Sequence, residues 1–345
     1  PLLTTSRAVI EDYLRRYRIP HVEDSTNRDD AYSRNKVRHQ VLPVLKEINP
    51  WLIPRTAETI GSLREDDAYL QAIADHEVQC AVRRGGELVL PVVRIAGQPG
   101  PIAVRMVRAL LAELEVHGVD YVDFRDLFAA MEDRDWSSWF FATDHHWTPE
   151  AAFTACGALF ELLASDYGYS TPAEYSDPSQ FTVEAWEDWF LGSLGKRVGT
   201  LYGGVDGIEL WKPVFETDFT YSVPIYEIER TGPFEESLLF PERLEEKDYF
   251  GGNPYTLYAG GDYPLARIYN HTDEDGPRIL LLRDSYACAM TPFLALGCSE
   301  LITVDLRYFH ENLLTYVDWL KPDLVLVLYT TGSVAQDALF EFLPT

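Results

Sequence analysis

Three short apolar runs near the carboxyl end of the chain place the strongest constraint on its fold. They cover residues 278–283, 301–305 and 323–329, and helical patterns fill the stretches between them. The runs recur about every 22 residues, which leaves room for the crossover helix that parallel neighbouring strands require. The sequence therefore predicts an α/β domain with a parallel sheet. A fourth β-rich run, residues 119–124, is expected to form another strand.

Charge and aromatic content change together near residue 115. Residues 1–114 hold 16 Lys and Arg against 15 Asp and Glu, whereas residues 115–345 hold 13 against 40 and seven of the eight Trp. This change predicts two segments of different origin. The total net charge of −26 repels phosphate backbones and anionic membrane surfaces, so composition disfavours nucleic acid as a partner over most of the chain.

Composition also limits the class of protein. A chain of 345 residues with 46% hydrophobic residues can bury a large core, which excludes disorder as its main state. The four cysteines lack C-x-x-C spacing and are expected to be buried free thiols: Cys80, Cys156, Cys288 and Cys298. We expect no membrane span and no secretory signal in the sequence as given, which makes the cytoplasm the default compartment.

The first segment is expected to be helical. Apolar residues recur with helical spacing over residues 6–14, 34–48, 57–82 and 102–114, and Ser6 is a candidate cap. Breaker residues at 85–86 and 97–101 separate the later helices. In the second segment, residues 170–260 are acidic and aromatic and include a hairpin-like piece at 201–207, so we interpret them as an insertion.

The sequence Thr-Asp-His-His-Trp-Thr-Pro-Glu (143–150) is the strongest local signal for chemistry. Two adjacent imidazoles follow a carboxylate just before a Pro/Glu helix start. Asp144 can orient His146 and stabilise its charged form if the turn folds back. The alternatives are a structural cap, in which Asp144 accepts backbone N–H bonds, and a metal site.

Ser285 lies in the sequence Arg-Asp-Ser-Tyr-Ala (283–287), between an apolar strand and a helical run. Open α/β sheets place their reactive groups at the carboxyl ends of strands, where a helix N-terminus can stabilise an oxyanion. The alternative is an ordinary N-cap serine.

Together these motifs resemble those of the DHHW protein family. The resemblance covers residues 115–345 and rests on the motifs at 143–153 and 280–287, the Pro-Phe-Leu-Ala that follows (292–295), and Val-Asp-Leu-Arg-Tyr-Phe (304–309). That family is similar to SGNH-like acyltransferases and esterases, including alginate O-acetyltransferase-type proteins. The resemblance implies a three-layer α/β/α domain with a Ser–His–Asp site that needs no cofactor and no metal.

By the same resemblance, Ser285 is the nucleophile, His146 the general base and Asp144 the residue that orients the imidazole. His145 is the alternative base; His146 is preferred because the related pattern is Asp-x-His-Trp.

Two further residues are implied near the reacting carbonyl. Gly261 is a candidate oxyanion donor beside the Ser285 N–H. Arg307 is a candidate oxyanion or substrate residue, and a structural ion pair is its alternative.

The first segment resembles tRNA(Ile)-lysidine synthetase, where the catalytic domain of that family ends and its helical domain begins. The likeness rests on Asp-x-Thr-Asn (24–27) and Arg-Asn-x-x-Arg-His (34–39) and fades by residue 114. The Ser-Gly-Gly-x-Asp-Ser loop that holds ATP phosphate in that family is absent from this sequence. Arg34, Arg38 and His39 are therefore candidates for weak tRNA contact only, with pairing to Asp24 and Asp29 as the alternative.

The sequence thus predicts a serine-dependent O-acyl esterase or O-acetyltransferase whose partner is an acylated carbohydrate or cell-envelope glycan. Aromatic residues of the insertion are expected to stack on sugar rings or to form its core: Trp186, Trp189, Tyr202 and Trp211. The alternatives are an inactive tRNA-modification remnant and a non-catalytic glycan-binding module. Relatives of the second segment usually work outside the membrane, so we also consider a fused or misassembled reading frame and leave the compartment open.

Overall fold

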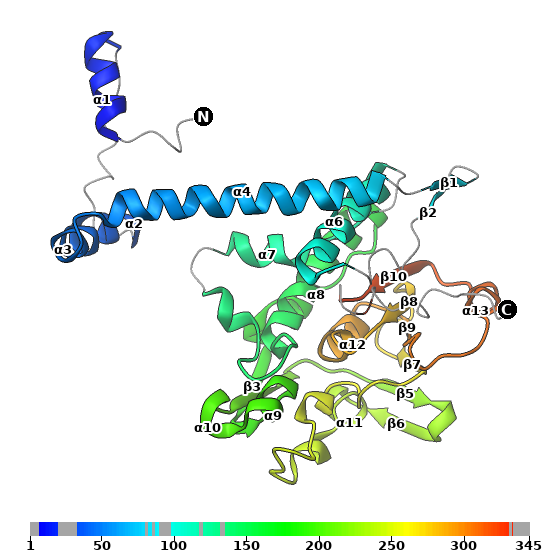
Figure 1. Cartoon of the computed structure of the whole chain (residues 1–345). Coiled ribbons are helices and arrows are strands. Elements are labelled where there is room, and N and C mark those ends of the chain that lie inside the picture. The colour runs from blue at the N-terminus through cyan, green and yellow to red at the C-terminus, as the bar shows by residue number, and fades with distance from the viewer. Residues whose placement is uncertain are drawn as a thin grey trace. The chain divides into compact units, whose positions relative to one another are not determined.

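The structure is a computed structural model (Figure 1). It describes residues 7–19, 33–79, 82–84, 87–89, 98–116, 120–131, 135–330 and 333. Two compact units divide the chain, Pro1–Ala72 and Ile73–Thr345, and the division falls within helix α4, Leu52–Gln79. The boundary between the two compact units, after Ala72, therefore differs from the boundary that composition indicates after residue 114. The boundary after residue 114 stays a prediction.

The described part of the first unit is helical, as expected. It contains α1 (Arg7–Arg16), α2 (Ser33–Lys36), a π-helical turn (Val37–Val41), α3 (Leu42–Ile48) and most of α4. The expected helix over 34–48 is thus present with a π-helical turn inside it. It ends at Asn49, which has extended backbone angles before Pro50. Ser6, the expected cap of the first helix, lies outside the described residues.

Two expectations are wrong at the start of the second unit. The first segment is not helical throughout, and the strand expected at 119–124 does not form in its described part. Strands β1 (Val82–Arg84) and β2 (Glu87–Val89) pair antiparallel on either side of the expected break at 85–86, which itself lies outside the described residues. The expected strand at 119–124 is absent from its described part, 120–124. There Asp123 accepts the Arg125 N–H and caps helix α7 (Phe124–Ala130), so capping overrides the β-rich composition. Helix α6 (Gly100–Val116) covers the expected helix at 102–114.

The main sheet confirms the three predicted parallel strands. They are β8 (Arg278–Arg283), β9 (Glu300–Val304) and β10 (Leu324–Leu328), and β8 pairs parallel with both others. The full order is β10-β8-β9-β7-β5-β6. The remaining strands, β7 (Leu265–Asn270), β5 (Phe219–Val223) and β6 (Ile228–Gly232), each pair antiparallel.

Only part of the segment 170–260 is an insertion separate from the main sheet. Strands β3 (Phe181–Phe190) and β4 (Asp206–Pro213) form their own antiparallel pair, whereas β5 and β6 extend the main sheet. The hairpin expected at 201–207 is wrong, because helices α9 (Ser193–Val198) and α10 (Thr200–Gly203) fill the connection between β3 and β4. Gly199 and Gly204, with φ of 81° and 73°, follow these helices in a conformation that suits glycine.

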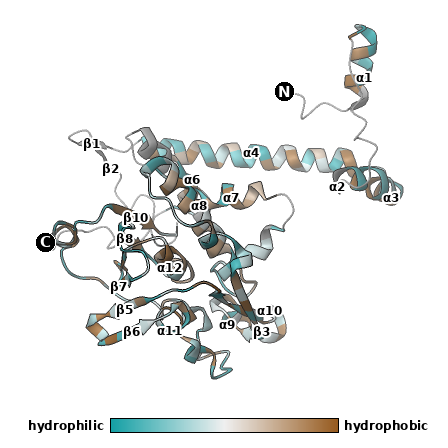
Figure 2. Ribbon diagram, turned by 180° about the vertical axis from the view of Figure 1, so that it is seen from behind, coloured by the Kyte–Doolittle hydropathy of each residue, from teal (hydrophilic) through white to brown (hydrophobic). Residues whose placement is uncertain are grey.

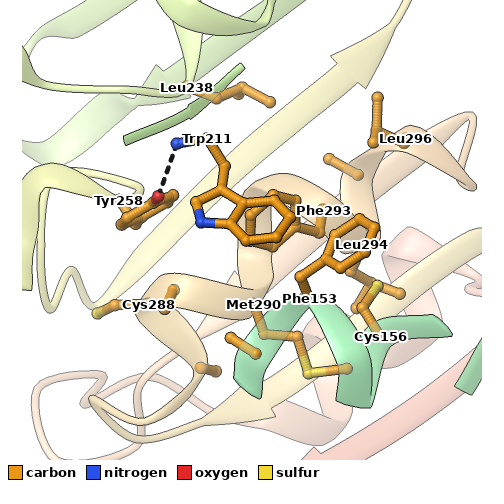
Figure 3. Close-up of a cluster of buried hydrophobic side chains, with 14 of the residues drawn as sticks. Phe153, Cys156, Trp211, Leu238, Tyr258, Cys288, Met290, Phe293, Leu294 and Leu296 are labelled. Carbon is orange, nitrogen blue, oxygen red and sulfur yellow. Dashed lines mark hydrogen bonds between the residues drawn. The ribbon is translucent and has the colours of Figure 1, made fainter. Parts of the chain in front are cut away.

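Helices cover both faces of the main sheet, which gives the predicted three layers. Buried side chains of α8 (Pro149–Tyr167) and α12 (Ala287–Leu296) pack with one face, and α13 (Leu313–Leu320) packs with the other. A short helix, α11 (Phe234–Ser237), lies on the α8 side of the core. Phe293 of α12 lies at the centre of this core among the rings of Phe153, Trp211 and Tyr258 (Figure 3).

Two compositional expectations can be compared with the described residues. Cys156, Cys288 and Cys298 are buried free thiols, as expected, and Cys80 lies outside the described residues. Within the described ranges, none of the helices has both the length and the apolar character needed to cross a bilayer.

Candidate active site

Ser285 occupies the turn between strand β8 and helix α12. The Asp284 carboxylate accepts the Tyr286 N–H at 3.0 Å with one oxygen, and the Thr330 N–H and hydroxyl at 2.9 and 2.8 Å with the other. This buried carboxylate fixes the turn at the carboxyl end of the strand. Ser285 itself is partly exposed, so its hydroxyl lies where a substrate can reach it.

Asp144 and His146 lie in a tight turn before helix α8. Phe140 and Trp147 form an isolated antiparallel bridge on either side of the turn. Asp144 Oδ1 accepts the His146 backbone N–H at 3.0 Å and also a short hydrogen bond from His146 Nδ1. The turn therefore folds back, as the sequence argument required, and both side chains are buried.

The structure brings Ser285 and His146 together across 139 residues of sequence. His146 Nε2 lies 2.8 Å from Ser285 Oγ, while Nδ1 of the same ring faces Asp144. A serine, an imidazole and a carboxylate thus form one hydrogen-bonded series. Chemically, such a series can remove the proton from a hydroxyl and stabilise the imidazolium that results.

Aromatic residues hold the two turns against each other. The His146 ring stacks on Tyr255, with ring centroids 4.0 Å apart and planes 19° from parallel. The Tyr255 hydroxyl and the Trp147 indole N–H both donate to the Tyr286 carbonyl, at 3.0 and 2.9 Å. Tyr286, which follows Ser285, is therefore anchored by Trp147 and Tyr255, two residues that lie next to His146.

Burial and hydrogen bonding act in opposite directions on Asp144. Burial alone would raise the pKa of its carboxyl, but the hydrogen bonds from the His146 ring and the Ser193 N–H outweigh it and hold that pKa well below its usual range. Burial, followed by the Asp284 and Asp144 charges, raises the pKa of Tyr286 to about 12. Asp144 is therefore a carboxylate, and Tyr286 a neutral phenol, at neutral pH.

His145, the alternative base, is placed differently. Its Nδ1 lies 2.9 Å from Ser193 Oγ and 3.3 Å from Asp144 Oδ1, and half of its side chain is exposed. Burial, followed by the neighbouring His146, lowers its pKa. No contact joins His145 to Ser285 among the described residues, whereas His146 makes one. The Tyr286 hydroxyl donates to the His145 carbonyl.

Metal ligation is the alternative that the sequence left open for this turn. One ligand atom each of Asp144, His145 and His146 lie within 4.8 Å of one another. Both ring nitrogens of His146 are already engaged, one by Asp144 and the other by Ser285. A metal ion bound to His146 would therefore have to break one of these two hydrogen bonds.

The oxyanion candidates are only partly assembled in the described part of the chain. Among the described residues, the Ser285 backbone N–H has no acceptor, so it is available to a ligand. Gly261 has a φ of 122°, and its carbonyl accepts a hydrogen bond from buried Arg283 at 2.7 Å. This contact fixes the orientation of the Gly261 peptide, but no described contact joins Gly261 to Ser285.

Arg307 takes part in a charged network. It forms a two-pronged ion pair with Asp305 and a 3.0 Å ion pair with Asp262. Asp262 in turn pairs with Arg283 at 2.8 Å. Arg307 thus forms structural ion pairs, which is the alternative given for it in the sequence analysis. None of these contacts reaches the Ser285 hydroxyl.

The aromatic residues of the insertion have different environments. Trp211 is 5% exposed and packs in the core, so it cannot present a surface to a sugar ring. Trp186 and Trp189 are partly buried and lie edge to face at 5.0 Å. Tyr202 is 87% exposed. Of the four candidate stacking residues, Trp211 therefore takes the alternative role in the core, because its position in β4 faces inward.

Four positions that contact the turn at residues 143–146 were not predicted from the sequence. Ser193 donates its N–H to Asp144, Gly192 lies against the Asp144 side chain, Asp206 holds Thr143, and Tyr255 stacks on His146. The only local signal is the Gly-Ser-x-Gly pattern at 192–195, which is too short to be specific. The hydrogen bonds that Ser193 and Asp206 form with residues 142–145 depend on the tertiary fold.

The candidates for tRNA contact lie in the first unit. Arg38 is partly exposed and His39 exposed, both in the π-helical turn, whereas the side chain of Arg34 lies outside the described part. Asp24 and Asp29, their alternative partners, also lie outside the described residues. RNA contact and ion pairing both stay predictions for these residues.

Comparisons with known protein families match two separate parts of the chain to different families. Residues 1–45 match the PP-loop domain family, and residues 96–200 match the family described as SGNH hydrolase-like domain, acetyltransferase AlgX. The second match contains the turn with Asp144 and His146 and ends before Ser285.

The curated relatives concern the first part of the chain. A tRNA(Ile)-lysidine synthase of Solibacter usitatus is 34% identical over 125 residues, which are 35% of this chain and 28% of the relative. That of Pseudomonas syringae is 40% identical over 105 residues, 30% of this chain and 23% of the relative. The chain thus spans less than a third of the length of these relatives.

Solved structures resemble the second part of the chain. A DHHW family protein from Eubacterium siraeum has a TM-score of 0.50 and 20% identity, covering 69% of this chain and 70% of the other. PatB1 of Bacillus cereus has a TM-score of 0.50 and 19% identity, covering 64% and 70%. The second part therefore has an SGNH-like fold and resembles the DHHW family, as the sequence motifs indicated.

Proposed function

We propose that residues 115–345 form a serine-dependent O-acyl esterase or O-acetyltransferase that acts on a carbohydrate or cell-envelope glycan. The observation that carries this proposal is the hydrogen-bonded series Asp144–His146–Ser285, with 2.8 Å between His146 Nε2 and Ser285 Oγ. A base within reach of the hydroxyl, itself oriented by a third group, is the arrangement that activates a serine. The matched family is described as an acetyltransferase, which supports the same chemistry.

In the first half-reaction, Ser285 Oγ attacks the carbonyl carbon of an acyl ester and gives its proton to His146 Nε2. The Asp144 carboxylate, held in its charged form, stabilises the imidazolium through Nδ1. His146 then returns the proton to the leaving alcohol oxygen, and the ester C–O bond breaks. The products of this step are the free alcohol and an acyl group on Ser285.

In the second half-reaction, an acceptor hydroxyl gives its proton to His146 and attacks the acyl carbon. Water as acceptor releases the free acid, whereas a sugar hydroxyl takes up the acyl group as a new ester. The proton returns to Ser285 Oγ in either case. The Ser285 N–H, in the turn just before helix α12, is our first candidate for the oxyanion donor, and Gly261 is the second.

The glycan assignment is supported by aromatic surface in the insertion. Tyr202 presents an exposed ring, and Trp186 and Trp189, both partly buried, pack against each other. Flat aromatic faces bind the apolar faces of sugar rings, and amphipathic rings such as Tyr and Trp suit a surface that is partly wet. The acylated glycan is therefore the substrate class that we test first.

The test measures hydrolysis of 4-nitrophenyl acetate and of an acetylated xylan by the full chain. We compare it with Ser285→Ala, His146→Ala and Asp144→Asn, and use the neighbour His145→Ala as the matched control. We expect Ser285→Ala and His146→Ala to lose turnover and His145→Ala to keep most of it. A folded parent chain without turnover contradicts the proposal and favours a non-catalytic glycan-binding module.

Covalent labelling provides an independent readout of the nucleophile. One solved structure of Bacillus cereus PatB1 carries a sulfonyl adduct. We expect a sulfonyl fluoride to add one label to this chain, detected by intact mass spectrometry, and Ser285→Ala to abolish it. In a separate reaction with unlabelled protein, 4-nitrophenyl acetate as acyl donor and an unacetylated oligosaccharide as acceptor distinguish the two activities, because only a transferase forms a new sugar ester. A label that persists in Ser285→Ala contradicts the assignment of the nucleophile.

The likeness of residues 1–114 to tRNA(Ile)-lysidine synthase supports a second candidate, a tRNA-modification remnant. We propose weak tRNA contact through Arg34, Arg38 and His39. Filter binding with tRNA at two salt concentrations tests this candidate, with the three positions changed to Ala as the comparison. Equal binding by both proteins contradicts the contact.

A further inference from the structure

The turn between strand β3 and helix α9 lies against the catalytic carboxylate. We infer that the Gly192–Ser193 peptide is the positioning element that fixes the Asp144 carboxylate toward His146. The Ser193 N–H donates to Asp144 Oδ2 at 2.6 Å, while Oδ1 accepts both hydrogen bonds from His146. This inference rests on the serine mechanism proposed above, and it assigns a role to residues outside the Ser–His–Asp series.

The two oxygens of the Asp144 carboxylate therefore bind different groups: Oδ1 binds His146, and Oδ2 binds the Ser193 N–H. A carboxylate held at one oxygen can rotate about its Cβ–Cγ bond, which would move Oδ1 out of line with the imidazole. The Ser193 N–H opposes this rotation because it binds the other oxygen from a rigid backbone position at the first residue of α9. Hydrogen bonds from backbone N–H groups to a carboxylate are also charge-assisted and strong.

Gly192 makes this close approach possible. A Cβ atom at position 192 would lie 2.2 Å from Asp144 Cβ and 2.4 Å from Asp144 Oδ2, far inside contact distance. The backbone of Gly192 has φ −75° and ψ −179°, which any residue adopts. Glycine is thus required here for space and not for backbone conformation.

The same turn is anchored on the residue before Asp144. The Gly192 N–H donates to Thr143 Oγ1 at 2.9 Å, and the Gly195 N–H donates to the Thr143 carbonyl at 2.8 Å. Asp206, the first residue of β4, accepts the Thr143 N–H and hydroxyl at 2.8 and 2.6 Å. The catalytic turn is therefore held between α9 and β4, and the Ser193 N–H is aligned with Asp144 by contacts that do not involve His146.

The first test removes this single N–H with Ser193→Pro. Proline is well tolerated at the first residue of a helix, and the extended backbone of Gly192 suits the position before a proline. The matched control is Thr200→Pro, at the first residue of α10. Outer partners of catalytic or metal-bound groups contribute about 10- to 100-fold, so we expect a loss of that size in kcat with KM unchanged for Ser193→Pro. Thr200→Pro should stay within about twofold of the parent.

Ser193→Ala separates the backbone from the side chain, because it keeps the N–H and removes only the hydroxyl near His145. A loss equal to that of Ser193→Pro would overturn the assignment to the backbone. Gly192→Ala is the second probe, and it displaces Asp144 by contact. Its matched control is Gly157→Ala in α8, where a Cβ would meet Ser176 at an ordinary 3.5 Å.

A double-mutant cycle distinguishes positioning from general damage. In an Asp144→Asn background, Ser193→Pro should cause little further loss of kcat, since the carboxylate that it positions is already gone. Additive losses would overturn the inference. The far-downfield NMR resonance of the His146 Nδ1 proton should be present in the parent and lost or shifted in Ser193→Pro and Gly192→Ala.

Failure of this inference is distinct from failure of the proposed function. Absence of Ser285-dependent turnover in the parent chain would defeat the proposed function. Ser285-dependent turnover that Ser193→Pro or Gly192→Ala retains in full would defeat only the positioning role.

Discussion

Helices α1 and α12 both contain ten residues, yet α12 is buried and α1 has exposed apolar side chains. All ten residues of α12 are buried between the main sheet and α8. In α1, the apolar stripe predicted from the sequence is present, but Val9 is 59% and Tyr13 56% exposed. A periodic stripe therefore specifies a helix and the face that it would bury, and burial requires a partner surface that the sequence of the helix does not supply.

The same contrast separates the described parts of the two units. In the first unit, large apolar side chains of α3 and α4 are exposed, and Ile48 is 76%, Ile53 44% and Leu63 60% exposed. Figure 2 shows hydrophobic residues interspersed with hydrophilic ones along α4. In the second unit, by contrast, Asp144 and His146 are both buried. We therefore expect chemistry and cooperative stability to belong to the second unit.

The largest expected effect is on catalysis. Ser285→Ala should lower the kcat for ester hydrolysis by about 10³- to 10⁶-fold, because residues of such a series act as a unit. Arg64→Ala, an exposed position of α4 in the first unit, should leave kcat unchanged. Steady-state kinetics on 4-nitrophenyl acetate measures both. A matching loss in Arg64→Ala would break the assignment of chemistry to the second unit.

The next effect concerns the core. Phe293→Ala removes a buried ring at the centre of the second unit and should lower the free energy of unfolding by about 3–5 kcal/mol. Leu45→Ala changes an apolar residue of α3 that is 39% exposed and should have an effect within about 0.5 kcal/mol. Denaturant unfolding compares the two variants. Similar losses would show that the first unit has a core of its own.

A smaller effect is the pH dependence that Asp144 contributes. Its pKa is lower in the folded chain than in the unfolded chain, so the unfolded chain binds more protons between the two values. This contribution is complete above the ordinary carboxyl pKa of about 3.9 and is lost as pH falls toward the folded value. The Tm difference between the parent and Asp144→Asn should be constant from pH 7 to about 5 and narrow below about pH 4. A difference that widens on acidification would contradict the lowered pKa.

The smallest effect is expected for removal of the first unit. Deleting residues 1–72 should leave the cooperative melt of the remainder in place, since the second unit begins at Ile73. Deleting residues 1–114 should also leave a folded remainder, but with a lower Tm, because it removes the fully buried Met106. Calorimetry of both truncated chains tests whether the folded second part begins after residue 72 or after residue 114. Loss of the cooperative melt in the shorter deletion would overturn the division of the chain.

Much of the fold follows from local patterns in the sequence. The runs at 278–283, 301–305 and 323–329 are strands because they are too short for helices and are separated by crossover helices. The errors also have local causes. Asp123 caps a helix where composition favours a strand, and the stretch that looked like a hairpin at 201–207 holds the end of helix α10 and the start of strand β4.

The sequence by itself determined the residue types of the site and part of its local geometry. Asp144 and His146 lie two residues apart, so one turn can join them, and Ser285 follows a buried strand that places it at a sheet edge. The related Asp-x-His-Trp pattern already favoured His146 over His145, but only the tertiary structure decided that His146 meets Ser285, because that contact spans 139 residues. It also decided that Ser193 faces Asp144, since a backbone N–H leaves no trace in the residue type and its alignment depends on Thr143 and Asp206.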